Sequence, residues 1–135
     1  MKKYKFFPPY QRTGKTTFPD TQQKAGVYLI KENDKITYIG YSAVNLYKTM
    51  YRHFQRWHHR TQEVVSYESR MKQNRYTVRV VLCTAIQAAR LERALIKKHR
   101  PRDNENKYKQ YEITVADLSI VEKYEASEIW GDPPF

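Results

Sequence analysis

The sequence contains a single cysteine, no long apolar run and no internal repeat. Cys83 cannot form an internal disulfide, so cross-links within the chain do not hold the fold together. No apolar stretch approaches the roughly 20 residues of a membrane-spanning helix, and the start of the chain lacks the apolar core of a signal peptide. We therefore expect an intracellular, cytoplasmic protein with no membrane partner and with no protein partner that the sequence identifies.

Acidic residues are scarce in all but the last part of the chain. Residues 1–109 hold 24 lysines and arginines against eight acids, a net charge of +16, whereas residues 110–135 hold six acids and one base. A positive body of this size favours a polyanionic partner, and DNA or another nucleic acid fits that description. The competing interpretation is a solvated surface that only keeps the protein soluble.

The length of 135 residues suits one domain with its own core. We interpret residues 1–24 as an irregular basic arm, residues 25–106 as the core and residues 107–135 as an acidic C-terminal extension. The extension could pack on the sheet, cover the basic surface or meet a partner, and we expect part of its aromatic ending to dock.

Apolar periodicity and capping signals predict three strands and three helices. The predicted elements are strands over 26–31, 35–41 and 76–83 and helices over 46–57, 85–100 and 114–130. The N-terminal caps are Asn45 or Ser42 for the first helix, Thr84 with Gln87 for the second and Thr114 with Asp117 for the third. This order predicts an α+β fold, in which helices flank a small three-stranded, mainly antiparallel sheet and a further helix ends the chain.

Glu92 is out of place on the apolar side of its predicted helix. Ala88 and Ala89 precede it by one turn, and Leu95 and Ile96 follow it by one turn. Residues at these spacings share a helix face, and burial of an unpaired carboxylate is costly. A salt bridge to an arginine would offset that cost. A divalent metal is the other interpretation, because Mg²⁺ takes carboxylate oxygens and otherwise keeps its waters.

The predicted helix over 46–57 carries a ridge of cations, with His53 beside Arg52 at its middle. A fixed guanidinium can stabilise charge that develops on phosphoryl oxygens. The alternative is that Arg52 and His53 merely belong to a solvated face. The candidate nucleic-acid contacts of the chain are Lys48, Arg52, Arg56, Lys97, Lys98 and Arg102.

Tyr28 and Tyr38 lie in the two strands of the predicted hairpin. A tyrosine, whose pKa is ordinarily about 10, can take a proton from water only if cations or hydrogen bonds stabilise the phenolate. A turn of about three or five residues would pair the two tyrosines directly, whereas a two-residue turn at Asn33-Asp34 would offset them. Either tyrosine could equally be a packed strand residue.

Together, these residues resemble the signature of the GIY-YIG nuclease superfamily. Two short strand motifs, a helix start, a helical glutamate and a proline-asparagine pair occur in the family's order and spacing. The matching residues are Gly26-Val27-Tyr28, Tyr38-Ile39-Gly40, Ser42, Asn45-Leu46, Glu92, Leu95-Ile96, Pro101 and Asn104. The resemblance covers residues 25 to about 106 and implies a metal-dependent endonuclease that hydrolyses phosphodiester bonds in DNA.

The resemblance also implies a role for each matching residue of the site. Tyr28 would be the general base or would orient the attacking water, and Tyr38 would form a hydrogen bond at the same site. Glu92 would be the sole protein ligand of one Mg²⁺ or Mn²⁺ ion, which would hold the scissile phosphate and stabilise the leaving 3′ oxygen. Asn104 would tie the loop after the helix to the site, and His53 matches a histidine or tyrosine that is frequent in the family. The expected products carry 5′-phosphate and 3′-hydroxyl ends.

One position departs from the family pattern. The family usually has an arginine in the motif Asn-Leu-x-x-Arg, where this chain has Lys48 or Thr49. We hypothesise that Arg52 supplies the guanidinium, with Lys48 as the second choice because its point charge lacks a bidentate fork. If neither reaches the site, the chain would be a catalytically weakened nucleic-acid-binding module. A zinc module is a further alternative, but His58-His59 lack paired cysteines at ligand spacing.

Overall fold

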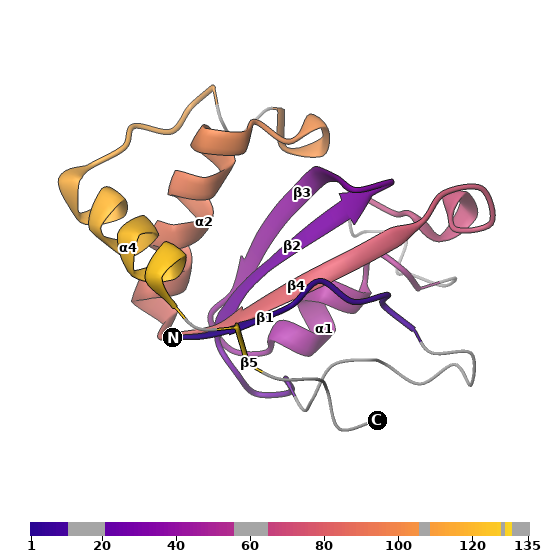
Figure 1. Cartoon of the computed structure of the whole chain (residues 1–135), viewed down its shortest axis with the longest axis horizontal. Coiled ribbons are helices and arrows are strands. Elements are labelled where there is room, and N and C mark those ends of the chain that lie inside the picture. The colour runs from indigo at the N-terminus through magenta and orange to yellow at the C-terminus, as the bar shows by residue number, and fades with distance from the viewer. Residues whose placement is uncertain (11–20, 56–64, 106–108, 128, 131–135) are drawn as a thin grey trace.

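The computed structural model describes residues 1–10, 21–55, 65–105, 109–127 and 129–130. A five-stranded sheet runs through the middle of the domain and carries helices on both faces (Figure 1). Its strands are β1 (Lys2–Tyr4), β2 (Gly26–Glu32), β3 (Lys35–Ser42), β4 (Tyr76–Leu82) and β5 (Ile129–Trp130), in the spatial order β3-β2-β4-β1-β5. The pairs β2–β3, β2–β4 and β1–β4 are antiparallel, and β1 pairs with β5 in parallel.

The predicted α+β class is confirmed, but the sheet is wider than the predicted three strands. Lys2–Tyr4 forms β1 on the free edge of β4, so the prediction of an irregular arm over 1–24 is wrong for this segment. Three residues are too few to show a period, and their partner lies far along the chain. β5 in turn pairs with β1, which confirms that part of the C-terminal ending docks. Residues 11–20 of the arm lie outside the described residues.

The described helices are α1 (Leu46–Tyr51), α2 (Ala85–His99) and α4 (Val115–Ala126), with 3-10 turns η1 (Glu68–Arg70) and η2 (Arg102–Asn104). Each predicted cap is present. The side chains of Thr84 and Thr114 accept from backbone N–H groups three residues on and complete reciprocal capping boxes, and Asn45 accepts from the N–H of Lys48. None of the helices in the described ranges is long and apolar enough to cross a membrane.

The first helix is shorter than the prediction over 46–57. After Tyr51, the N–H groups of His53 and Phe54 bond to carbonyls three residues back, so the chain tightens into turns and leaves the α-helical path. Both side chains are buried, which means that packing against the sheet determines this segment more than helical periodicity does. Trp57 lies outside the described residues.

The two faces of the sheet carry separate hydrophobic cores. The first core joins β2 and β4 to α1 and includes Tyr28, Ile30, Leu46, Met50, Val78 and Val80. The second joins the sheet to α2 and α4 and includes Val27, Leu29, Ile39, Val81, Leu91 and Leu95. Alternate residues of each strand point to opposite faces, so the tyrosine of the first strand motif belongs to the α1 face.

The β2–β3 hairpin turns through Asn33 and Asp34, which both adopt positive φ (51° and 68°). Asn and Asp tolerate this conformation better than most residues, and it is typical of tight hairpin turns. The two-residue turn is therefore the one the protein uses, and Glu32 pairs with Lys35 directly beside it.

A β-bulge follows the turn and changes the register of the hairpin. Lys31 pairs with Ile36, but Ile30 pairs with Tyr38, so Thr37 is an extra residue on β3. Its buried hydroxyl donates to the carbonyl of Ile30 over 3.3 Å. A one-residue shift of register moves side chains to the other face. Because of the bulge, Tyr38 lies on the same face as Tyr28, in a diagonal position.

Gly40 pairs with Tyr28 across the hairpin. A Cβ atom at Gly40 would overlap the phenol of Tyr28, whose hydroxyl and ring carbons would be its nearest neighbours. The missing side chain therefore provides the space in which the Tyr28 ring lies.

We expect Gly40→Ala to lower the free energy of unfolding by about 1–3 kcal/mol, because the new methyl group overpacks a buried site. Urea denaturation measures the change. Lys35→Ala, at an exposed position of the same strand, should change the free energy of unfolding by less than about 0.5 kcal/mol. Equal stability of the two variants would contradict the close contact between Gly40 and Tyr28.

Candidate active site

The buried hydroxyl of Tyr28 forms a hydrogen bond with His53 over 2.7 Å to Nε2. The other ring nitrogen of His53, Nδ1, lies 2.6 Å from the carbonyl oxygen of Val65. A carbonyl can only accept, so Nδ1 carries the proton in the neutral ring and Nε2 is the acceptor. Tyr28 therefore donates its hydroxyl proton to His53.

Tyr38 completes an aromatic group around this hydrogen bond. Its ring centroid lies 6.0 Å from that of Tyr28 and 4.5 Å from that of His53. The structure thus brings together three residues that the sequence predicted for the site. Two of them come from the hairpin on the α1 face, and His53 comes from the turns that follow α1.

Tyr67 holds the backbone of His53 in place, and the sequence did not predict this role. Its N–H donates to the carbonyl of His53 over 2.7 Å, and its hydroxyl donates to Oδ2 of Asp103 over 2.6 Å. With the bond to Val65, these contacts hold both the ring and the backbone of His53. Tyr67 lies in a segment without periodicity, so no signal in the sequence points to it.

Burial raises the pKa of Tyr28 well above its ordinary value, since a phenolate loses its hydration there, and the nearby Tyr38 and Glu92 add to the shift. Burial also raises the pKa of Tyr38, and the charge of Glu92 adds to that shift. Both hydroxyls are therefore protonated near neutral pH. Loss of a proton from Tyr28 requires an acceptor, and Nε2 of His53 is already in place.

Glu92 of α2 is buried, with only 2% of its surface exposed, as its place among apolar residues predicted. The hydroxyl of Tyr111 donates to its Oε1 atom over 3.0 Å. Because the charge of Glu92 raises the pKa of Tyr28, Tyr38 and Tyr111, the carboxylate lies within electrostatic reach of both hairpin tyrosines.

Tyr111 belongs to the acidic extension, which packs on α2. Arg93 follows Glu92 on α2. Its guanidinium donates to both carboxylate oxygens of Asp117 in α4, over 2.7 and 3.1 Å. These bonds lower the pKa of the buried Asp117 carboxyl. The described part of the extension packs on α2, and its Ile120 and Tyr124 share the second core with sheet residues, which agrees with the first of the three predicted arrangements, packing on the sheet. The hydroxyl of Tyr111 could not be assigned to the site from sequence, because tyrosine alone carries no such signal.

Asn104 joins the turn after α2 to the outer edge of the hairpin. Its Oδ1 accepts from the N–H of Ile39 over 2.8 Å, and its Nδ2 donates to the carbonyl of Ile39 over 3.0 Å. The amide thus satisfies both backbone groups of a buried residue on an edge strand. It ties η2 to β3 at the residue that follows Tyr38.

The predicted nucleic-acid contacts lie in different settings. Lys48 is exposed and Arg52 is half-buried, and within the described ranges no hydrogen bond or ion pair joins either side chain to Tyr28, Tyr38 or Glu92. Lys97 is half-buried on α2. Arg56 and His58-His59 lie outside the described residues.

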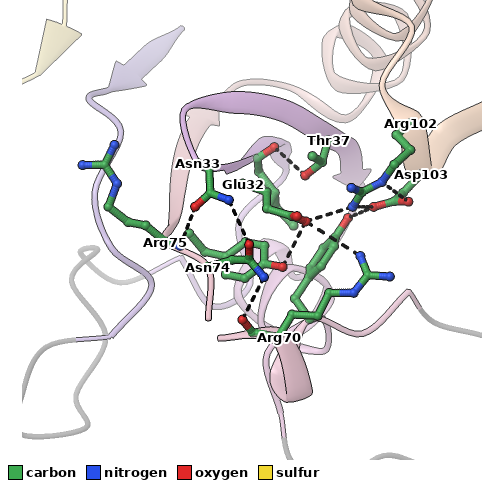
Figure 2. Close-up of polar contacts among 11 residues, drawn as sticks. Glu32, Asn33, Thr37, Arg70, Asn74, Arg75, Arg102 and Asp103 are labelled. Atoms are coloured by element: carbon green, nitrogen blue, oxygen red, sulfur yellow. Dashed lines mark hydrogen bonds and ion pairs between the residues drawn. The ribbon is translucent and has the colours of Figure 1, made fainter. Parts of the chain in front are cut away.

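Two predicted contacts are engaged in ion pairs within the chain. Lys98 pairs with Glu125 over 2.6 Å, and Arg102 pairs with Glu32 and with Asp103 over 2.9 Å each. Figure 2 shows Arg102 between these two carboxylates, at the end of the hairpin. Arg102 therefore ties η2 to β2, and Asp103 extends the connection to Tyr67.

The donor atoms fit one hard cation that is held in part by water and substrate. Among the described residues, no group of three or more His, Cys, Asp or Glu side chains could hold a metal ion, so a closed zinc site is absent from them. Glu92 offers a buried carboxylate within electrostatic reach of Tyr28 and Tyr38. Mg²⁺ is often bound by one or two carboxylates, several waters and substrate phosphates.

We expect the neutral ring of His53 to be protonated at Nδ1 and not at Nε2, because Nδ1 faces a carbonyl oxygen. Heteronuclear NMR of the ring nitrogens distinguishes the two forms. The exposed His99 serves as the control and should show an averaged mixture. In Tyr28→Phe the Nε2 signal of His53 should shift, since its donor is removed. A proton on Nε2 in the unmodified protein would contradict the direction of the Tyr28 hydrogen bond.

A family model described as the UvrC-like GIY-YIG domain matches residues 24–105 of the chain. This span contains both strand motifs, His53, Glu92 and Asn104. No curated protein and no solved structure matches the chain. The match covers more than half of the 135 residues and coincides with the antiparallel hairpin, its flanking helices and the polar site between them. The chain belongs to the UvrC-like GIY-YIG domains of the GIY-YIG nuclease superfamily.

Proposed function

We propose that the protein is a metal-dependent endonuclease that hydrolyses phosphodiester bonds in DNA. The observation that carries the proposal is the buried hydrogen bond from Tyr28 to His53, within electrostatic reach of the buried carboxylate of Glu92. Membership of a nuclease family and the net charge of +11 both favour a nucleic-acid substrate.

Tyr28 and His53 act together as the general base in this proposal. Burial alone would keep Tyr28 protonated, so the phenol gains basicity only as its own proton moves to Nε2 of His53. The phenol oxygen then accepts a proton from the attacking water, whose oxygen bonds to phosphorus while the bond to the 3′ oxygen breaks, and the leaving 3′ oxygen takes a proton from solvent. The carbonyl of Val65 holds the ring in the required tautomer.

Glu92 would hold one Mg²⁺ or Mn²⁺ ion together with waters and the substrate phosphate. When bound, such an ion neutralises charge on the phosphoryl oxygens and on the leaving oxygen. Tyr111 bonds to Oε1 of Glu92 and so fixes the orientation of the carboxylate. Support of this kind is typical of metal-ligating carboxylates, which are themselves hydrogen-bonded in most sites.

A binding module is the second candidate, and one observation favours it. The described structure holds neither Lys48 nor Arg52 against the tyrosines or Glu92 by a hydrogen bond or ion pair, and the usual family arginine is missing. A site without a guanidinium would stabilise the transition state less well. In that case the protein would bind nucleic acid with little or no cleavage.

We expect Glu92→Gln to reduce cleavage at least about a hundredfold, because the amide removes the charge that holds the cation. Plasmid and single-stranded DNA are incubated with each protein in Mg²⁺, Mn²⁺ or EDTA, and Mn²⁺ binding is measured separately by calorimetry. Glu122→Gln, on the exposed side of α4, is the matched control and should cut normally.

The controls separate the two candidate functions. No cleavage of either substrate with either metal would favour the binding module. Cleavage that persists in Glu92→Gln would identify a contaminating nuclease or a different site. Unchanged Mn²⁺ binding in Glu92→Gln would remove this carboxylate as the metal ligand.

We expect Arg52→Ala to lower the single-turnover cleavage rate about a hundredfold, if Arg52 replaces the family arginine when DNA binds. Lys48→Ala should change the rate less and should mainly weaken binding, with a lower dependence on salt. Arg52→Lys tests the need for the guanidinium fork. Full activity of Arg52→Ala would exclude Arg52 from the mechanism.

A further inference from the structure

A polar pocket of ≈ 400 Å³ lies on the sheet face opposite Tyr28. Residues of β1, β2, β3 and β4 line it, together with Phe6 and the C-terminal ends of α2 and α4. Leu29, a member of the second core, lies at its base. Its ionisable lining residues are Lys3, Lys31, Arg79, Lys98, His99 and Glu125. Cations therefore outnumber carboxylates in a concave site that the family resemblance does not explain.

Arg79 and Lys31 rest on the same aromatic ring. The guanidinium of Arg79 lies 4.5 Å from the ring centroid of Phe6, and Nζ of Lys31 lies 4.0 Å from it. Arg79 also donates to the hydroxyl of Tyr124 over 2.9 Å. Its Nε atom is buried and has no hydrogen-bond partner among the described residues. Within the same ranges, neither cation pairs with a carboxylate.

Lys3 of β1 brings a further positive charge to the pocket. Its side chain is 8% exposed, and Nζ donates to the backbone carbonyl of Tyr124 over 3.0 Å. Burial lowers the pKa of Lys3, and the charge of Arg79 lowers it further. Burial also lowers the pKa of His99, and the nearby Lys98 adds to that shift. The positive charges of Lys3 and Arg79 thus repel each other, and a bound anion would relieve that repulsion.

Glu125 is the one carboxylate among the described residues that line the pocket. It pairs with Lys98 over 2.6 Å, and both side chains are about half exposed. Exposed pairs of this kind contribute little to stability and open readily. The charge of Glu125 also raises the pKa of Lys3, but this one carboxylate does not balance the positive charges of Lys3, Lys31 and Arg79.

We propose that this pocket binds a phosphate group, either of a free phosphate compound or of a nucleic-acid backbone. A phosphate has several acceptor oxygens, which suit a buried guanidinium N–H and lysines that approach from different strands. The proposal is independent of cleavage, because the pocket and Tyr28 lie on opposite faces of the sheet.

Calorimetric titration of the full chain with sodium pyrophosphate and with a short DNA duplex, both in EDTA, tests the proposal. Lys31→Gln should weaken binding of at least one of them about tenfold, the effect of one charge-assisted hydrogen bond. Lys123→Gln makes the same change of charge on the exposed surface of α4 and should change the dissociation constant less than about twofold. Thermal melting confirms that each variant is folded, and Lys98→Gln repeats the test at the exposed rim.

The two titrations distinguish the sources of the phosphate. Weaker pyrophosphate binding with unchanged duplex binding assigns the pocket to free phosphate compounds. Weaker duplex binding, with the slope of log Kd against log salt reduced by about one, assigns it to a backbone phosphate. The proposal is overturned if the unmodified protein binds neither probe, or if Lys31→Gln and Lys123→Gln bind both probes equally.

Discussion

The pairing of Tyr28 with Gly40 fixes the geometry of the site, and it depends on one extra residue in β3. Between the turn and this pair, β3 carries the bulged residue Thr37, which has no partner on β2. If regular pairing ran through Thr37 without a bulge, Tyr28 would face Ile39, and Tyr38 would point to the α2 side of the sheet. With it, both phenols lie on the α1 face and leave room for the imidazole of His53.

The same constraint explains why the site is assembled from segments far apart in the chain. The hairpin supplies two rings, but their polar partner comes from the turns after α1. The segment that includes Val65 and Tyr67 then holds this partner by its ring and its backbone. Each polar atom of His53 in these contacts has a fixed role, so the site is organised before any ligand arrives. Organisation of this kind is what electrostatic stabilisation of a transition state requires.

Features that depend on local chemistry could be predicted from the sequence. The capping pairs Thr84–Gln87 and Thr114–Asp117 are set within one turn of a helix, and the burial of Glu92 follows from neighbours three and four residues away. The two-residue turn at Asn33-Asp34 also rests on local preference, but the sequence left the turn length open and the structure decides it. For these features, tertiary contacts reinforce what the local residues favour.

Features that depend on distant contacts could not be predicted. Thr37 is unremarkable in sequence, and only its pairing environment in the folded hairpin shows it to be a bulge. From the sequence, Arg102 is a candidate phosphate contact. In the structure it donates to Glu32, which lies 70 residues away in the chain. β1 is three residues long and becomes a strand only because β4 offers it an edge. The family resemblance predicted site residues, but it did not predict the contacts that Tyr67 and Tyr111 make with Asp103 and Glu92.

Two consecutive residues of α2 join the family core to the extension that follows it. Glu92 accepts from Tyr111, and Arg93 clamps Asp117. Both partners lie beyond residue 105, where the family match ends. A domain boundary drawn at that point would therefore cut through a hydrogen-bonded unit and would leave Glu92 and Arg93 without these partners. A gene fusion or a domain transplant would have to carry the extension along, because it forms one wall around the buried carboxylate.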